Sequence, residues 1–199
     1  METIILARHG ETSMNAEGLL RGLADPDLSD RGRAQAEALA DEVTSRFDVR
    51  LVVSTPLQRA RHTAAAVAAR VGAEVQVDAE LNDRDYGPWT GKPRADVIAE
   101  WGSLDAAPGV ESPDAVVLRA YPALGRWADQ AAATGGVAVV VTHDAVIRPL
   151  LVRIDAQITE AEVPTGSYQV LQRDSDGWRV VELDRIPVTA AIGDAGEAR

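Results

Sequence analysis

The sequence predicts an α/β fold, a three-layer α/β/α sandwich in which helices cover both faces of one central sheet. Three short apolar runs, each bounded by turn or polar residues, are typical of buried parallel strands. They cover residues 4–7, 51–53 and 137–141. Segments with helical spacing of apolar residues alternate with these runs, and this alternation favours right-handed crossovers between parallel strands.

The helices are predicted from their capping residues and their apolar spacing. Ser29 or Asp30 can cap the first helix, Gly72 ends the second, and Ser112 can cap the longest. Pro122 falls inside that longest helix and should kink or split it. The expected helices cover residues 32–45, 57–71, 93–101 and 113–133, with a short strand at 74–77.

The last part of the chain is predicted to add a hairpin. Residues 168–172 and 178–183 flank Asp176-Gly177, which is a strong hairpin signal. No linker or repeat divides the chain, so we expect a single domain over residues 1–186. The small, mixed residues of 187–199 are expected to form a flexible tail.

Composition limits the classes of function. The chain has 199 residues, 46% of them hydrophobic, and can bury a full core. It has no cysteine, which excludes disulfides and thiol chemistry and fits a reducing cytoplasm. No apolar run approaches the roughly 18 residues that span a bilayer, and no basic stretch precedes the first strand, so we expect a cytoplasmic protein without a membrane partner. The net charge of −11 argues against a nucleic-acid partner.

Charged and imidazole groups stand near the ends of the three predicted strands. Arg8 and His9 follow the first apolar run, His143 follows the last, and Arg59 lies in the first turn of the helix after the second. Open α/β folds place their ligands at the carboxyl ends of parallel strands. Because a guanidinium binds phosphate or carboxylate and would repel a cation, we expect an anionic ligand there and no metal at His9.

Five motifs occur in a fixed order along the chain. They are RHGET at 8–12, STPLQRARHTA at 54–64, LNDRDYGPWTG at 81–91, PGVES at 108–112 and VTHDAVIRPLL at 141–151. Together they resemble the motifs of the histidine phosphatase superfamily, the phosphoglycerate-mutase-like group, in its branch 1 type. The resemblance extends from Ile4 to about Leu151. It implies a mostly parallel sheet with one antiparallel strand.

The resemblance also implies roles for the catalytic residues. His9 is expected to attack phosphorus and form a phosphohistidine that water hydrolyses. Arg8, Arg59 and His143 would surround the transferring phosphoryl group and stabilise its charge. Asp83 stands where the family commonly has the glutamate that protonates the leaving group and then activates water. No metal and no cofactor are required.

Further residues are expected at the edge of the phosphate site. Asn15 resembles the phosphate-contacting asparagine of the family, and Arg21 and Gly22 are expected to contribute to substrate binding. Thr12 can add a hydroxyl, and a cap on the following helix is an equal alternative for it. The expected partner is a small phosphorylated metabolite, and a homodimer is left open.

The proton donor departs from the family pattern, because aspartate is one methylene shorter than the family's glutamate. Asp85 lies two residues after Asp83 and would share a face with it in an extended segment, so it is the reserve candidate. The structural alternative is a solvated pair of aspartates bridged to Arg84 or Arg94.

A second departure from the family pattern follows His143. Asp144 replaces a glycine there, and its simplest role is to cap a helix that begins at Ala145. If its carboxylate instead turned toward the ring, it would favour protonated His143. Pro149 suggests a kink in that helix.

The sequence favours a phosphatase that hydrolyses a small soluble phosphomonoester. Mutases of the family carry a longer insertion, whereas only residues 92–107 separate two of the motifs here. A mutase and a catalytically silent phosphate-binding module are the alternatives. Arg21 and the segment 86–105 are the expected contributors to leaving-group recognition, although the aromatic residues of that segment could equally pack it onto the core.

Overall fold

The computed structural model describes residues 1–188, in which one six-stranded sheet has the order β3-β2-β4-β1-β5-β6. Strands β1 to β4 pair in parallel, and β5 runs antiparallel to both of its neighbours, β1 and β6. The prediction of a mostly parallel sheet with one antiparallel strand is therefore confirmed. The strands are β1 (Glu2–Arg8), β2 (Val49–Ser54), β3 (Val75–Val77), β4 (Val137–Thr142), β5 (Tyr168–Asp174) and β6 (Gly177–Arg185).

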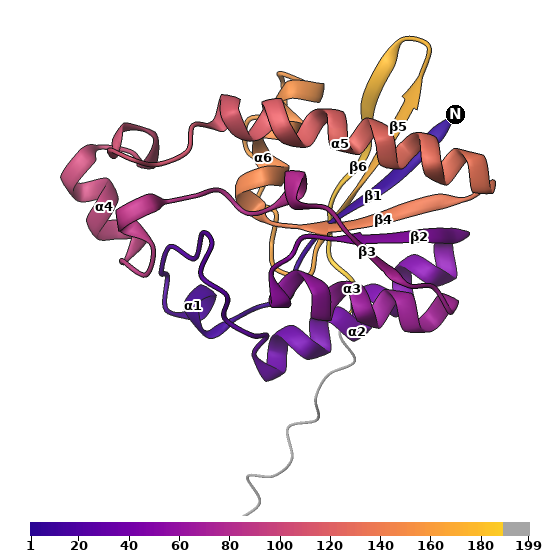
Figure 1. Cartoon of the computed structure of the whole chain (residues 1–199), viewed down its shortest axis with the longest axis horizontal. Helices are drawn as coiled ribbons and strands as arrows, with labels where there is room; N and C mark the ends of the chain where they lie inside the picture. The colour runs from indigo at the N-terminus through magenta and orange to yellow at the C-terminus, as the bar shows by residue number, and fades with distance from the viewer. Residues whose placement is uncertain (189–199) are drawn as a thin grey trace, which may run out of the picture.

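Helices cover both faces of this sheet. Helices α2 and α3 lie on one face and α5 and α6 on the other, which gives the three layers seen edge-on in Figure 1. The α-helices are α1 (Ser13–Ala16), α2 (Asp30–Arg46), α3 (Gln58–Val71), α4 (Arg94–Trp101), α5 (Pro113–Thr134) and α6 (Asp144–Ile154). Three 3₁₀ turns are η1 (Ala79–Leu81), η2 (Gly87–Trp89) and η3 (Leu104–Ala106).

Successive residues of the central strands are buried on opposite faces of the sheet. In β1, Ile4 and Leu6 pack among residues of α5 and α6, whereas Ile5 and Ala7 pack among residues of α2 and α3. All four side chains are fully buried. Strands enclosed on both faces need apolar side chains at every position, which is why β1 and β4 stand out in the sequence as unbroken apolar runs.

The predicted capping residues are found at the helix ends. Ser29 accepts the Gly32 N–H at the start of α2, and Ser112 accepts the Ala115 N–H at the start of α5. The predicted split at Pro122 is wrong, because α5 is one helix of 22 residues that continues through this proline. Its neighbours on the helix, among them Ala123 and Leu124, are fully buried against the sheet. The free energy gained by this burial offsets the loss of the one backbone hydrogen bond that proline cannot donate.

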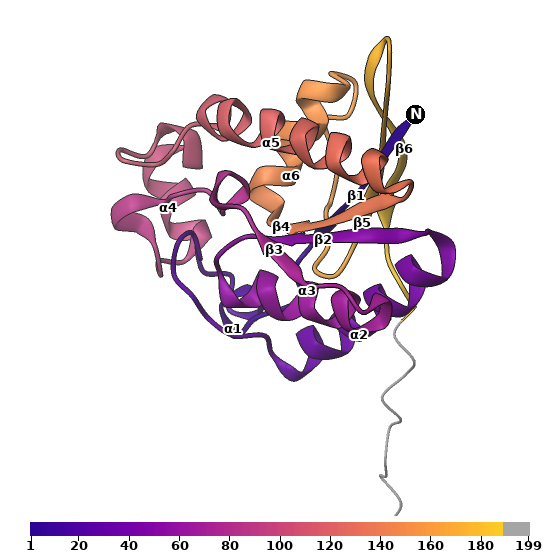
Figure 2. The same ribbon diagram turned by 45° about the vertical axis from the view of Figure 1, so that its right-hand side comes forward.

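A third cluster of apolar residues lies beyond the carboxyl ends of the parallel strands. It joins the segment after β1 to the long connection between β3 and α5 through Leu20, Tyr86, Val97, Leu104 and Ala107. Figures 1 and 2 both show α1 and α4 on this side of the molecule. The cluster therefore covers the edge of the sheet at which the sequence predicts ligand binding.

Among residues 1–188, no helix combines the length and the apolar character that crossing a membrane requires. Most of the predicted tail, residues 189–199, lies outside the described residues.

Candidate active site

Two histidines meet at the carboxyl ends of β1 and β4. These strands are parallel neighbours with Arg8 in register with Thr142, and the His9 N–H donates to the Thr142 carbonyl at 3.0 Å. The rings of His9 and His143 are fully buried, and their centroids lie 5.0 Å apart. The sheet ladder therefore brings together two side chains that are far apart in the sequence.

The ring of His9 is held in one tautomer. Its Nδ1 lies 2.6 Å from the Gly10 carbonyl oxygen. A carbonyl only accepts, so Nδ1 carries the proton and the neutral ring has its lone pair on Nε2. Nε2 is buried, and no atom of residues 1–188 is hydrogen-bonded to it. This nitrogen is therefore free to act as a nucleophile.

Both rings are kept neutral by their surroundings. Burial lowers the pKa of His9 well below its usual value of 6.5, and the positive charges of Arg59 and Arg8 act in the same direction. Burial likewise lowers the pKa of His143, with Arg59 adding to the effect. His143 Nε2 lies 3.0 Å from the hydroxyl of Thr55, which fixes the ring against the end of β2.

Arg59 connects the sheet edge to the proposed acid. It lies in the first turn of α3 and is fully buried. Its Nη2 donates to Asp83 Oδ2 at 2.8 Å and to the Gly22 carbonyl at 2.9 Å, and its Nη1 donates to the Ala24 carbonyl at 2.7 Å. The guanidinium thus ties the loop after α1 to the segment that carries Asp83.

The structure brings Asp83, and not Asp85, to the histidines. Asp83 is 2% exposed, and its Oδ2 lies 3.5 Å from His143 Nδ1. Burial raises the pKa of Asp83, against the opposing charge of Arg59. Asp85 is exposed, and its carboxylate accepts the Gly87 N–H. The alternative of a solvated aspartate pair is wrong, because Asp83 is enclosed and paired with Arg59.

Asp144 does not cap its helix. His143 is the N-cap and Asp144 is the first residue of α6. The Asp144 carboxylate lies 2.9 Å from Arg21 Nη2 and 3.5 Å from Arg8 Nη2. Burial raises the pKa of Asp144, but the arginine charges outweigh burial and the pKa is lowered overall. The carboxylate is therefore paired with two arginines, while burial keeps the pKa of His143 low.

Thr12 and Asn15 are occupied by a helix cap. The Thr12 N–H and hydroxyl both donate to Asn15 Oδ1, at 3.0 and 2.8 Å, and Thr12 Oγ1 accepts the Asn15 N–H. This is the capping alternative for Thr12. Both residues lie within six residues of His9 in the sequence. Gly22 contributes to the site with its carbonyl, which accepts a hydrogen bond from Arg59.

Two buried threonines that the sequence did not single out support the histidines. Thr55 contacts His143, as described above, and Thr63 Oγ1 accepts the Gly10 N–H at 3.0 Å. Gly10 lies so close to α2 that a Cβ there would come within 2.2 Å of the Gly32 carbonyl oxygen. Thr55 is the second residue after the predicted strand 51–53, and this position near a strand end is the signal that could have identified it.

Several buried nitrogens of these residues have no hydrogen-bond partner within the described part of the chain. They include Arg8 Nε, His9 Nε2, Arg21 Nε, Arg59 Nε and His143 Nδ1. Buried polar atoms normally have partners. Unpartnered arginine donors near a neutral imidazole suit binding of an anion.

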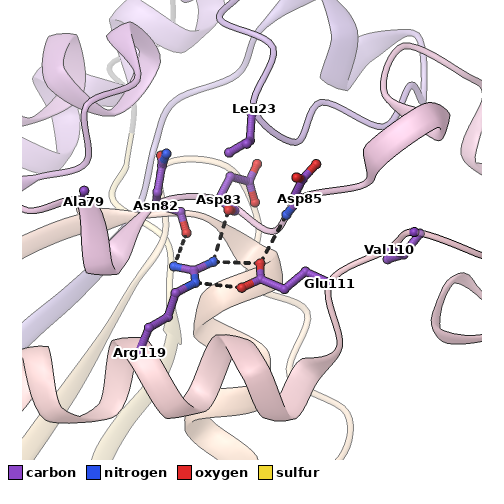
Figure 3. Close-up of a pocket in the computed structure, with 9 residues that line it drawn as sticks. Leu23, Ala79, Asn82, Asp83, Asp85, Val110, Glu111 and Arg119 are labelled. Atoms are coloured by element: carbon purple, nitrogen blue, oxygen red, sulfur yellow. Dashed lines mark hydrogen bonds and ion pairs between the residues drawn. The ribbon is translucent and has the colours of Figure 1, made fainter.

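A pocket of about 500 Å³ opens beside Asp83 (Figure 3). A second pocket, of about 440 Å³, lies beside Asp144 and includes Tyr86, Leu104 and Asp105 from the segment expected to recognise the leaving group. Trp89 and Trp101 of that segment pack edge to face, with ring centroids 5.8 Å apart. The aromatic residues of this segment thus contribute to the packing of the third apolar cluster.

Comparison with known proteins gives a consistent assignment. The Histidine phosphatase superfamily (branch 1) model matches residues 4–185. Phosphoglycerate mutase-like protein 4 of Arabidopsis thaliana is 35% identical, over 89% of this chain and 82% of that protein. The 2,3-bisphosphoglycerate-dependent phosphoglycerate mutase of Mesorhizobium japonicum is 29% identical, over 87% of this chain and 93% of that protein. The solved mycobacterial glucosyl-3-phosphoglycerate phosphatase with VO3 has a TM-score of 0.79 at 26% identity, covering 93% of this chain and 100% of that chain. The chain therefore belongs to the histidine phosphatase superfamily, branch 1.

Proposed function

We propose that this protein is a metal-independent phosphatase that hydrolyses a small soluble phosphomonoester through a phosphohistidine on His9. The observation that carries the proposal is the lone pair on His9 Nε2, which has no partner among the described residues and lies among buried arginines. A neutral imidazole nitrogen in such a site is a nucleophile for phosphorus.

The first step transfers the phosphoryl group to the enzyme. His9 Nε2 attacks phosphorus, the ester P–O bond breaks, and the leaving alkoxide takes a proton from Asp83. Arg8, Arg59 and His143 surround the equatorial oxygens, which carry the charge in the transition state. The raised pKa of Asp83 supports its role as the acid.

The second step regenerates the enzyme. The Asp83 carboxylate accepts a proton from water while the water oxygen attacks phosphorus and the P–N bond breaks. Inorganic phosphate leaves, and His9 and Asp83 return to their starting protonation states. One aspartate thus serves both steps, which requires that it lie beside the leaving oxygen and then beside the incoming water.

The segment 92–107 is short, and this supports hydrolysis because the resemblance implies a longer insertion in mutases. The alignment with the Mesorhizobium japonicum mutase has 194 positions but includes 87% of this chain, so about 20 positions of that mutase have no counterpart here. The preference for hydrolysis depends on this difference in length. A cytoplasmic location and a metabolite substrate belong to the same proposal, supported by the absence of cysteine and by the net charge of −11.

The test is a panel of metabolite phosphoesters incubated with the purified enzyme in the presence of a chelator. We expect release of inorganic phosphate from one chemical class of ester, with a phosphoenzyme trapped by rapid quenching in the native protein and missing in His9→Ala. Transfer of phosphate to a second hydroxyl without release would identify a mutase. Binding without turnover would identify a silent module, and activity only with added metal would overturn metal independence.

A further inference from the structure

We propose that Arg119 and Glu111 are positioning residues that hold the backbone of Asp83 against the two histidines. The inference rests on the proposed function, because it concerns the acid of that reaction. Neither residue is given a role in the mechanism above. Glu111 belongs to the PGVES motif, and Arg119 lies in the second turn of α5.

The backbone around Asp83 needs such support. Residues 82–86 connect η1 to η2, and within residues 1–188 they belong to no strand of the sheet. The pocket of about 500 Å³ borders this segment, being lined by Asn82, Asp83 and Asp85 (Figure 3). The pocket leaves one side of the segment open, so hydrogen bonds contribute to holding its position.

Arg119 donates hydrogen bonds to η1 and to the first two residues of the segment. Its Nη1 donates to the carbonyls of Glu80 and Asn82, both at 2.8 Å, and its Nη2 donates to the carbonyl of Asp83 at 3.1 Å. Donors that carry a charge form stronger hydrogen bonds than neutral ones. One side chain on a long, packed helix thus anchors the main chain immediately beside the acid.

Glu111 orients Arg119 and holds the far end of the same segment. Its two carboxylate oxygens accept from Arg119 Nε at 2.8 Å and Nη2 at 3.0 Å, a two-point pairing that fixes the guanidinium plane. Glu111 also accepts the Asp85 N–H at 3.2 Å and donates its own N–H to the Asp85 carbonyl at 2.8 Å. Figure 3 shows the side-chain bonds of this network beneath Asp83.

The opposite end of the segment is tied to the strand of His143. The Thr142 hydroxyl donates to the Leu81 carbonyl at 2.7 Å, and Thr142 directly precedes His143. The distance from Asp83 to His143 is thus set by Thr142 on one side and by Arg119 and Glu111 on the other. Because aspartate has one methylene less than glutamate, its carboxyl group has less freedom to compensate for a displaced backbone.

The test compares Arg119→Ala with a matched control on the same helix. Arg126 also pairs with a carboxylate, that of Asp78, but is half exposed and contacts the backbone of neither Asn82 nor Asp83 in the described structure. We expect Arg119→Ala to lower kcat/KM for an alkyl phosphate by about 10²-fold, the loss that a displacement of roughly 1 Å can cause. For nitrophenyl phosphate, which needs no proton from an acid, the loss should be below about threefold, and Arg126→Ala should leave the ratio of the two substrates unchanged.

A second variant and a reference variant decide the remaining outcomes. If Arg119→Ala does not fold by circular dichroism, Glu111→Gln is judged by the same substrate ratio. An unchanged ratio in the folded variant overturns the positioning role if Asp83→Asn does change it. If Asp83→Asn leaves the ratio unchanged as well, Asp83 is not the acid, and the proposed mechanism fails together with the inference. Partial recovery of the ratio in Arg119→Lys, which keeps the charge and some donors, supports the role.

Discussion

The two histidines and the acid of this site are held in different ways. His9 and His143 follow directly on β1 and β4, whose pairing places them side by side through backbone hydrogen bonds. Asp83 lies in a connection between two short turns and is held by side chains from three other elements: Arg59 of α3, Arg119 of α5 and Thr142 of β4. The proposed nucleophile is thus placed by the sheet, whereas the proposed acid is placed by long-range polar contacts.

This difference has consequences for mutation. A substitution at a strand end removes a functional group and leaves the backbone ladder intact, since the ladder does not depend on side chains. A substitution in the contacts of Asp83 can displace the acid without removing it. The two halves of the site should therefore respond differently to substrates, pH and neighbouring mutations.

The largest effect is expected for His9→Ala. The variant lacks the nitrogen that is proposed to form the covalent intermediate, so turnover should fall by roughly 10³-fold or more. Its circular dichroism and unfolding midpoint should stay close to those of the native protein, because the His9 N–H remains available to Thr142. More than a few per cent of native turnover in a folded variant would remove His9 from this role.

The acid half is tested by Asp83→Asn, with Asp85→Asn as the matched control. Protonation matters most for a poor leaving group, so Asp83→Asn should slow alkyl phosphate hydrolysis by roughly 10²- to 10⁴-fold and slow nitrophenol release far less. Asp85 is exposed and bonded to Gly87, so its variant should change neither rate appreciably. If Asp85→Asn alone shows the dependence on leaving group, the proton donor lies two residues further along. Phosphoenzyme formation must be the step measured in both variants.

Arg59 belongs to both halves, because it borders the phosphoryl site and holds Asp83. Arg59→Ala should cost about 3 to 4 kcal/mol of transition-state stabilisation for nitrophenyl phosphate, as removal of one buried charge-assisted donor does, and more for an alkyl phosphate because Asp83 also loses a partner. Arg61 is exposed on the same helix and provides the control, with an expected loss below about twofold. A rise in KM with unchanged kcat would show that Arg59 binds ground and transition states equally.

The buried histidines predict how stability depends on pH. Burial lowers the pKa of His9 and of His143, so below about pH 6.5 the unfolded chain binds more protons than the folded chain. The free energy of unfolding should therefore fall on acidification, by up to about 1.4 kcal/mol per pH unit for each histidine. In urea unfolding at about pH 5 to 6, the free energy of unfolding of His9→Asn should change less steeply with pH than that of the native protein, by the contribution of one histidine. Asp83, whose pKa is raised, contributes equally to both proteins. An equal dependence on pH in the variant and the native protein would contradict the prediction.

The smallest expected effect concerns Asp144, which follows His143 and reduces the positive charge of the site. Asp144→Asn keeps the size of the side chain and removes its charge, so inorganic phosphate should inhibit roughly fivefold more strongly. Asp41→Asn, which removes an exposed partner of Arg70 on the opposite side of the sheet, should leave inhibition unchanged. Weaker inhibition in Asp144→Asn would show that orientation of Arg8 and Arg21 matters more than the added charge.

Particular residues show how far the sequence alone could lead. The continuous apolar runs of β1 and β4 determined which strands are central, and the polar residues directly after them predicted His9 and His143 at one edge. Capping by Ser29 and Ser112 fixed the starts of α2 and α5. These features are local or periodic, so they can be recognised without knowledge of tertiary contacts.

Other features depended on contacts between distant segments. Asp83 and Asp85 are equivalent in sequence pattern, and burial of only the first against Arg59 distinguishes them. Asp144 at a helix start has the local pattern of a cap, yet two arginines from elsewhere in the chain take its carboxylate.

The sequence by itself therefore determined the fold class, the sheet edge and the histidine pair, because strand periodicity and strand ends are encoded locally. Only the tertiary structure decided which aspartate faces the histidines, where Asp144 points and how Arg119 reaches the backbone of Asp83. These outcomes depend on burial and on charge pairing across long sequence separations, and neither has a local pattern in the sequence.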